Sequence, residues 1–162
     1  MQESGVTYLA DAHISGKLIK ILRHVGEKSI LSVQKVFAEG VNDEVWIPKA
    51  TERGFVCITY DRRMLGNDAI LPFLIEAEAR VIFIGSHLAR AKLWDQALWM
   101  LRYWRKIRQY ATSLQAGQCI RVHKNGRISP LQLDDQANAS PRPTKRSKLQ
   151  PEEPGSSLWG TA

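Results

Sequence analysis

The sequence has few cysteines and no long hydrophobic run, and both absences narrow the class of protein. Its two cysteines, Cys57 and Cys119, lie far apart without a CxxC pattern. This favours reduced thiols over a disulfide framework or a cysteine ligand set. No stretch approaches the roughly 20 apolar residues that a membrane-spanning helix needs. Residues 1–5 also lack the basic and then apolar layout of a secretory signal. We therefore expect a cytoplasmic protein without a membrane partner.

Acidic residues are scarce in one segment, which makes the distribution of the net charge of +7 uneven. Residues 86–133 contain nine Lys or Arg and one acid, Asp95, for a net charge of +8. Residues 1–85 have a net charge of −1, and residues 134–162 have none. A basic segment beside a nearly neutral one suits a polyanionic partner, because phosphates neutralised by Lys and Arg release counterions. A skewed surface charge without a function is the alternative.

Apolar runs alternate with helical patterns over the first half of the chain. The apolar runs are typical of buried strands and cover residues 6–10, 29–33, 55–59 and 81–85. Helical spacing of apolar residues separates them: one helix follows Ser15 and ends at Gly26, one runs from Asp43 to about Arg53, and one begins near Pro72. This order predicts an α/β fold with a small open parallel sheet flanked by helices.

The pattern changes after Gly85. Residues 87–113 lack Pro and Gly and predict one long helix, with Trp94, Leu98 and Leu101 in a stripe beside Ala97 and Trp104. Strand-like runs at 118–123 and 127–133 flank an Asn-Gly turn and predict a β-hairpin. We expect three parts: an α/β core (1–85), a basic helix and hairpin that complete the domain (86–133), and a disordered tail (134–162).

Three aspartates occupy comparable places in this pattern. Asp11 ends the first strand, Asp61 follows a later strand, and Asp43 lies in the first turn of a helix. Carboxyl ends of parallel strands form a ligand-binding edge, and gathered carboxylates favour a hard divalent cation. Such an ion can activate a water for attack on a phosphodiester. Each aspartate alone also has a structural explanation, because Asp often caps a turn or begins a helix.

Three segments resemble the PIN-like domains of VapC-type toxins. They are YLAD at residues 8–11, DEVWIP at residues 43–48 and RGFVCITYDRR at residues 53–63. The likeness extends over roughly residues 6–133 and includes the basic, Trp-rich helix and the hairpin. It implies a metal-dependent endoribonuclease, the toxin of a toxin–antitoxin pair, with Mg²⁺ or Mn²⁺ held by the catalytic residues Asp11, Asp43 and Asp61. Glu44 ranks below them, because we expect it to face elsewhere on its helix.

One departure from the family pattern leaves a second function open. Many PIN-like domains have a further acid just after the Thr-x-Asp motif, where this sequence has Arg62 and Arg63. Asp68 is a possible substitute. The alternative is a non-catalytic PIN-like module that binds RNA or a protein. A two-component receiver domain also uses strand-end aspartates, but it needs an acidic pair after the first strand, where this sequence has one acid.

RNA and protein partners follow from the same residues. Arg62 and Arg63 are expected to hold a phosphate near the metal, or else to lie in a solvated turn. On the basic helix, Trp99 and Tyr103 share a side with cations and offer either RNA stacking or core and dimer contacts. An antitoxin is an expected partner, and a homodimer through this helix is a second. The expected RNA-binding residues are Arg62, Arg63, Arg102, Arg105 and Lys106.

Two further side chains near the aspartates have alternative roles. Thr59 can donate a hydrogen bond to a water in the site or pair within the edge of the sheet. His13 can contact substrate or have a structural role.

Overall fold

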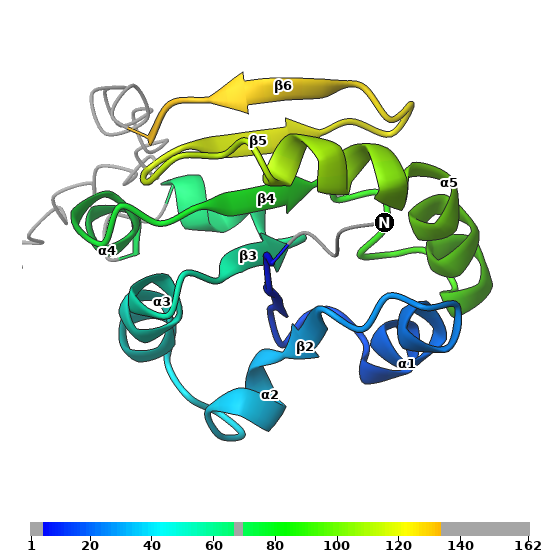
Figure 1. Cartoon of the computed structure of the whole chain (residues 1–162), viewed down its shortest axis with the longest axis horizontal. Helices are drawn as coiled ribbons and strands as arrows, with labels where there is room; N and C mark the ends of the chain where they lie inside the picture. Colours follow the sequence, from blue (N-terminus) through cyan, green and yellow to red (C-terminus); the bar gives the residue numbers. More distant parts are fainter. Residues whose placement is uncertain (1–4, 67–69, 134–162) are drawn as a thin grey trace, which may run out of the picture.

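A six-stranded sheet organises the computed structural model, which describes residues 5–66 and 70–133 (Figure 1). The strand order is β2-β1-β3-β4-β5-β6. The first five strands are parallel, and β6 runs antiparallel to β5. This confirms the predicted α/β class with a terminal hairpin. The strands are β1 (Tyr8–Ala10), β2 (Ile30–Ser32), β3 (Val56–Thr59), β4 (Val81–Ile84), β5 (Cys119–Val122) and β6 (Ile128–Leu131).

Helices cover both faces of the sheet and make two hydrophobic cores. One core packs against α1 and α5, and the other packs against α3 and α4. Because side chains alternate along a strand, Ile58 faces the first core whereas Cys57 faces the second. Burial on both faces explains the continuous apolar runs of β3 and β4. The helices are α1 (Gly16–His24), α2 (Val33–Val36), α3 (Asp43–Glu52), the 3₁₀ helix η1 (Arg62–Gly66), α4 (Leu71–Glu76) and α5 (Leu93–Ala111).

The helices nearest the aspartates begin and end as their sequence signals predict. The Ser15 hydroxyl accepts a hydrogen bond from the Lys17 N–H at 3.2 Å and caps α1. Gly26, with φ of +103°, lies in the turn after α1, a conformation that glycine adopts without strain. Asp43 is the first residue of α3, as predicted. Within the described ranges, no helix has the length and apolar character needed to cross a membrane.

The helix α5 differs from its prediction at its start and in its buried face. Residues 86–90 form turns, and the helix begins at Leu93 rather than at residue 87. The turns place Leu88 in the core next to α1, which a straight helix from residue 87 does not explain. The buried side chains of α5 are Ala97, Met100, Trp104, Ile107 and Ala111.

The predicted stripe on α5 is therefore split. Ala97 and Trp104 are buried, whereas Trp94, Leu98 and Leu101 are 74%, 52% and 45% exposed. The predicted disordered tail, residues 134–162, lies outside the described residues.

Glu27 is a buried carboxylate that joins α5 to the turn after α1. It is 5% exposed and accepts a 2.7 Å hydrogen bond from the Trp104 indole N–H. Arg108 forms an ion pair with it at 2.9 Å, and the backbone N–H of Ser29 donates to its other oxygen. The buried charge is thus compensated by three donors, one of them a cation. No local pattern marks Glu27 in the sequence, because its side-chain partners Trp104 and Arg108 lie far along the chain.

We expect Glu27→Ala to lower the free energy of unfolding by about 2–4 kcal/mol, because Trp104 loses its acceptor and Arg108 its counter-charge. Urea denaturation followed by circular dichroism measures this. The matched control is Glu52→Ala at the exposed end of α3, which should change stability by less than about 0.5 kcal/mol. Equal stability of the two variants would contradict this role for Glu27.

Candidate functional site

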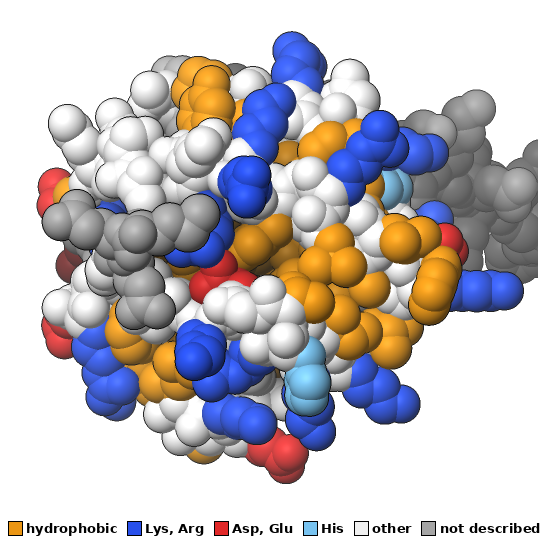
Figure 2. Space-filling model, turned by 45° about the vertical axis from the view of Figure 1, so that its right-hand side comes forward, with side chains coloured by type: hydrophobic (Ala, Val, Ile, Leu, Met, Phe, Trp, Pro, Cys, Tyr) orange, Lys and Arg blue, Asp and Glu red, His pale blue; other side chains and the backbone are white. Residues whose placement is uncertain are grey.

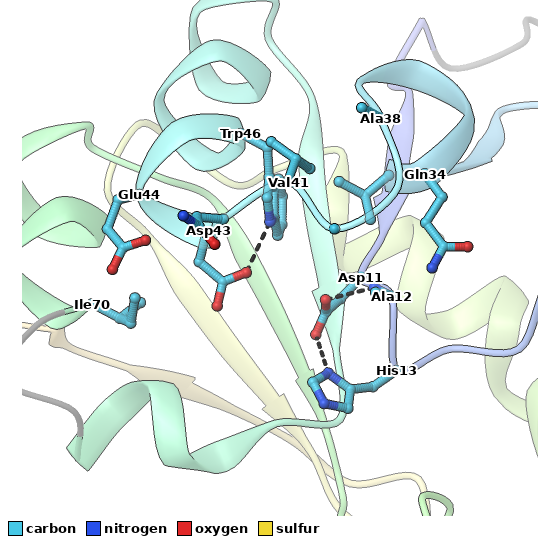
Figure 3. Close-up of a pocket in the computed structure, with 13 residues that line it drawn as sticks. Asp11, Ala12, His13, Gln34, Ala38, Val41, Asp43, Glu44, Trp46 and Ile70 are labelled. Atoms are coloured by element: carbon cyan, nitrogen blue, oxygen red, sulfur yellow. Dashed lines mark hydrogen bonds and ion pairs between the residues drawn. The ribbon is translucent and has the colours of Figure 1, made fainter.

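A pocket of about 380 Å³ lies where the chain leaves β1 and β2 (Figure 3). The turn after β1 forms one wall and the first turn of α3 forms the opposite wall. Both segments follow the carboxyl edge of the sheet, where ligands bind in open α/β folds. The acidic and polar side chains that line the pocket are Asp11, His13, Gln34, Asn42, Asp43 and Glu44.

Asp11 is the most tightly held carboxylate in the pocket. It is 2% exposed, and its backbone N–H continues the ladder with the Ile58 carbonyl at 2.9 Å. One carboxylate oxygen accepts from the backbone N–H of Ala12. The other accepts from the Thr59 hydroxyl at 2.9 Å and lies 3.0 Å from Nδ1 of His13. These contacts fix the orientation of the carboxylate, as is required of a metal ligand or a catalytic group.

Asp43 approaches the same pocket from the first turn of α3. One of its oxygens accepts a 2.8 Å hydrogen bond from the indole N–H of the buried Trp46. The other oxygen points into the pocket, on the side that Asp11 faces (Figure 3). Burial raises the pKa of Asp43, and the negative charges of Asp11, Glu44 and Asp61 raise it further. The three other carboxylates therefore lie close enough to Asp43 to oppose its ionisation.

Asp61 lies beside the pocket and is held by an arginine. Its carboxylate accepts hydrogen bonds from Nε of Arg63 at 2.9 Å, from Nη2 at 3.1 Å and from the backbone N–H at 3.0 Å. Hydrogen bonding to Arg63 lowers the pKa of Asp61. Asp61 is not among the residues that line the pocket of Asp11 and Asp43. Both of its oxygens are thus occupied by a cation of the chain itself.

The three predicted metal ligands are therefore not equivalent. The pocket brings Asp11 and Asp43 together, whereas Asp61 is adjacent and paired. Across residues 5–66 and 70–133, no three His, Cys, Asp or Glu side chains form a group that could hold one metal ion. Glu44, which sequence analysis expected to face elsewhere, lines the pocket next to Asp43 (Figure 3). The expectation failed because the first turn of α3 presents both of its acids to the same opening.

Thr59 links two of the aspartates. Its hydroxyl donates to Asp11 and accepts from the backbone N–H of Asp61, both at 2.9 Å, and the residue is 1% exposed. The expected partner of this hydroxyl was a water in the site or the edge of the sheet, and its contacts with both aspartates were not expected. The TxD spacing was the available signal, because a strand-end hydroxyl two residues before an Asp can accept the N–H of that residue.

His13 lies at the open side of the pocket. Its side chain is 55% exposed, and hydrogen bonding to Asp11 raises its pKa. This contact gives the histidine a structural role at the site, and its exposure leaves it accessible from the pocket.

The predicted RNA-binding residues fall in several places. Arg63 pairs with Asp61, and the Lys106 ammonium donates to the Gly126 carbonyl at 2.9 Å. Arg102 and Arg105 are exposed on α5, and the Arg102 guanidinium lies 5.6 Å from the ring of Tyr103. The side chain of Arg62 and the whole of Asp68 lie outside the described part of the chain.

The hairpin covers the aromatic side of α5. The Trp99 indole N–H donates to the Lys124 carbonyl at 2.8 Å, and its ring lies 5.0 Å from that of Tyr103. A side chain at Gly126 would collide with the Tyr103 ring, so the turn lies directly on this ring. These two aromatic residues therefore make structural contacts, which sequence analysis held open beside RNA stacking.

The charge on the surface agrees with a site for an anionic ligand. Figure 2 turns the right-hand side of Figure 1, toward which β4 and β5 point, to the viewer. On this face Lys and Arg side chains lie above and below a small acidic area, which borders hydrophobic side chains on its right (Figure 2). An acidic area with cations on two sides can hold a cation and attract a polyanion at the same time.

Comparison with known proteins gives one match. A family model described as PIN like domain matches residues 6–86, which include β1 to β4 and all three aspartates. No curated protein and no solved structure matches the chain significantly. The basic helix α5 and the hairpin lie beyond the matched residues.

We expect Thr59→Val to lower the free energy of unfolding by about 1–3 kcal/mol, because the N–H of Asp61 loses its acceptor and Asp11 loses a donor. The control is Thr51→Val, since this hydroxyl only donates to the Ile47 carbonyl within α3. Urea denaturation compares the two variants. If Thr59→Val were no less stable than Thr51→Val, the hydroxyl would not be an essential link.

Proposed function

The chain belongs to the PIN-like domain family, and on this premise we propose that it is a divalent-metal-dependent endoribonuclease. PIN-like domains are in general nuclease-type modules. The observation that supports the proposal most is the pocket in which Asp11 and Asp43 face each other at the carboxyl edge of the sheet. The finer assignment that we propose is the toxin of a toxin–antitoxin pair of the VapC type.

The donor set of the pocket fits Mg²⁺ or Mn²⁺. Mg²⁺ is commonly bound by one or two carboxylates, several waters and phosphates of the substrate, so Asp11 and Asp43 can suffice without a third ligand. Glu44 is available next to Asp43. The raised pKa of Asp43 reflects burial and repulsion between neighbouring carboxylates, both of which a cation would oppose. When bound, the ion would supply an activated water and neutralise charge that develops on the phosphate.

Each residue of the site has a separate task in this proposal. Asp11 and Asp43 hold the ion, and Thr59 and His13 keep the Asp11 carboxylate in one orientation. Asp61 would be able to add a third carboxylate only if Arg63 moved away from it.

The basic residues hold the RNA in this proposal. Arg63 exchanges its partner Asp61 for an RNA phosphate, since a guanidinium binds phosphate and carboxylate with the same fork of donors. Arg62 lies next to it in the sequence, and Arg102 and Arg105 would hold RNA farther from the cut. Lys106 ranks below them because its ammonium is bound to the hairpin.

Protein partners follow from the toxin assignment. An antitoxin would restrain the nuclease by covering the acidic pocket or by inserting a basic group into it. A homodimer through α5 stays a prediction. The exposed Trp94, Leu98 and Leu101 form the apolar surface that such an interface would use.

The ion pair of Asp61 and Arg63 favours a second candidate function, a non-catalytic module that binds RNA or protein. A carboxylate bound at both oxygens by an arginine is not free to hold a metal. If Arg63 never leaves Asp61, the basic side chains near the site can still bind RNA, but Asp61 cannot bind a metal ion.

We expect cleavage of single-stranded RNA in Mn²⁺ and none in EDTA. Asp11→Asn and Asp43→Asn should each slow cleavage by more than about 100-fold, because losing even an outer-shell partner of a metal costs about 10–100-fold. The matched control is Asp95→Asn, an exposed carboxylate on α5, which should cleave at the wild-type rate. Cleavage that continues in EDTA would refute the metal mechanism. RNA binding without cleavage under any condition would favour the non-catalytic module.

Replacing Arg63 tests whether it competes with the metal. We expect Arg63→Gln to tighten Mn²⁺ binding roughly two- to fivefold in calorimetry, because an exposed ion pair opposes a competitor only modestly. Arg90→Gln removes an exposed charge from the turn before α5 and serves as the control. An unchanged Mn²⁺ affinity of Arg63→Gln would exclude Asp61 from the metal site.

A further inference from the structure

A second pocket, of about 180 Å³, lies at the same edge of the sheet as the acidic pocket. The ends of β4 and β5 and the turns that follow them form its walls. Its polar side chains are Ser86, His87, Arg121, His123 and Lys124. None of these residues has a part in the function proposed above.

The lining of this pocket is strongly basic. It contains two cations, Arg121 and Lys124, and two imidazoles, but no acidic side chain among the residues that form it. Burial lowers the pKa of His87, and the positive charge of Lys124 lowers it further. Like charges gathered in a concave site raise the local concentration of an anion. The electrostatics of this pocket are therefore opposite to those of the pocket of Asp11 and Asp43.

The imidazole of His87 is fixed and has an unused donor or acceptor. Its ring packs edge-on against Trp99, with centroids 5.6 Å apart. The ring also lies so close to Gly85 that a side chain at this position would collide with it. Its Nε2 is buried and has no hydrogen-bond partner within the described residues. A buried polar atom without a partner is unfavourable, so the ring is held here by packing and not by a hydrogen bond from Nε2.

The register of the sheet places the two pockets on one line. Asp11 is bound to Thr59, Thr59 pairs with Phe83 of β4, and Phe83 pairs with Arg121 of β5. Arg121 is thus three strands away from Asp11, or about 14 Å at a strand spacing of about 4.8 Å. Equivalent positions in a parallel sheet direct their side chains to the same face. One single-stranded RNA can therefore reach both pockets within a few nucleotides.

We propose that the pocket of His87, Arg121 and Lys124 binds a phosphate group of the RNA at a position a few nucleotides from the bond that is cut. This inference rests on the proposed function, because it takes RNA as the ligand. Arg121 and Lys124 supply the charge that binds the phosphate, and the ring of His87, packed against Trp99, forms a fixed wall of the pocket. The pocket sets how the strand lies across the sheet edge and has no part in the chemistry.

The test measures RNA binding in EDTA, where cleavage is not required. Fluorescence anisotropy of a short single-stranded RNA is recorded over a series of salt concentrations for Lys124→Gln and Arg121→Gln. Each variant should weaken binding several-fold, and losing one phosphate contact should reduce the slope of log K against log salt by about 0.7. The control Lys20→Gln removes an exposed charge from α1, away from either pocket, and should keep the wild-type slope.

Stability and cleavage separate the possible causes of a change. Lys124 is exposed, so Lys124→Gln should keep the wild-type thermal midpoint even if Arg121→Gln is less stable. Wild-type affinity and slope in Lys124→Gln would overturn the inference, whether or not the protein cleaves RNA. A reduced slope in a protein that cleaves no RNA would support the pocket and contradict the proposed nuclease.

The source of the phosphate is distinguished by the end of the RNA. Equal affinity for two RNAs, one with a 5′-phosphate and one with a 5′-hydroxyl, assigns the pocket to an internal phosphodiester. Tighter binding of the RNA with the 5′-phosphate, with the gain lost in Lys124→Gln, assigns the pocket to a terminal phosphate. Loss of affinity in Lys20→Gln equal to that in Lys124→Gln would contradict a specific site of either kind.

Discussion

The hydrogen bond from the Thr59 hydroxyl to the Asp11 carboxylate is the constraint on which the candidate site depends. It crosses from β3 to β1, so the parallel pairing of these two strands sets the place of the carboxylate. The same hydroxyl accepts the N–H of Asp61 and fixes where the chain turns after β3. Since both residues lie at strand ends that are buried on two faces, the carboxylate is held by the core rather than by a loop.

The carboxyl edge of the sheet has two pockets, one lined by acidic side chains and the other by basic side chains. The turn after β1 and the start of α3 bring carboxylates together, whereas the ends of β4 and β5 bring cations together. A metal ion and a phosphate need opposite environments, and a single bound strand of RNA needs both. The order of the strands separates the two pockets, because β3 lies between β1 and β4. The proposed function therefore depends on the order of the strands as well as on single residues.

The sequence predicted the fold class and the places of the aspartates, because these depend on local signals. Apolar runs marked the strands, and Asp43 after a turn marked the start of α3. The contacts of the site depend on distant pairing and were missed. The role of Glu27 depends on the packing of α5 against the turn after α1. The contact of Thr59 with Asp11 depends on the pairing of β1 with β3. The buried face of α5 was likewise set by its neighbours rather than by its own spacing.

In the proposed function, Asp11 and Asp43 share a divalent cation. Crystals grown with Mn²⁺ and measured near its absorption edge test this directly through the anomalous difference map. We expect one strong peak in the pocket, about 2.1 Å from a carboxylate oxygen of each aspartate. A well-ordered structure of the active protein with no peak between these two residues, or with its only peak elsewhere, would contradict it.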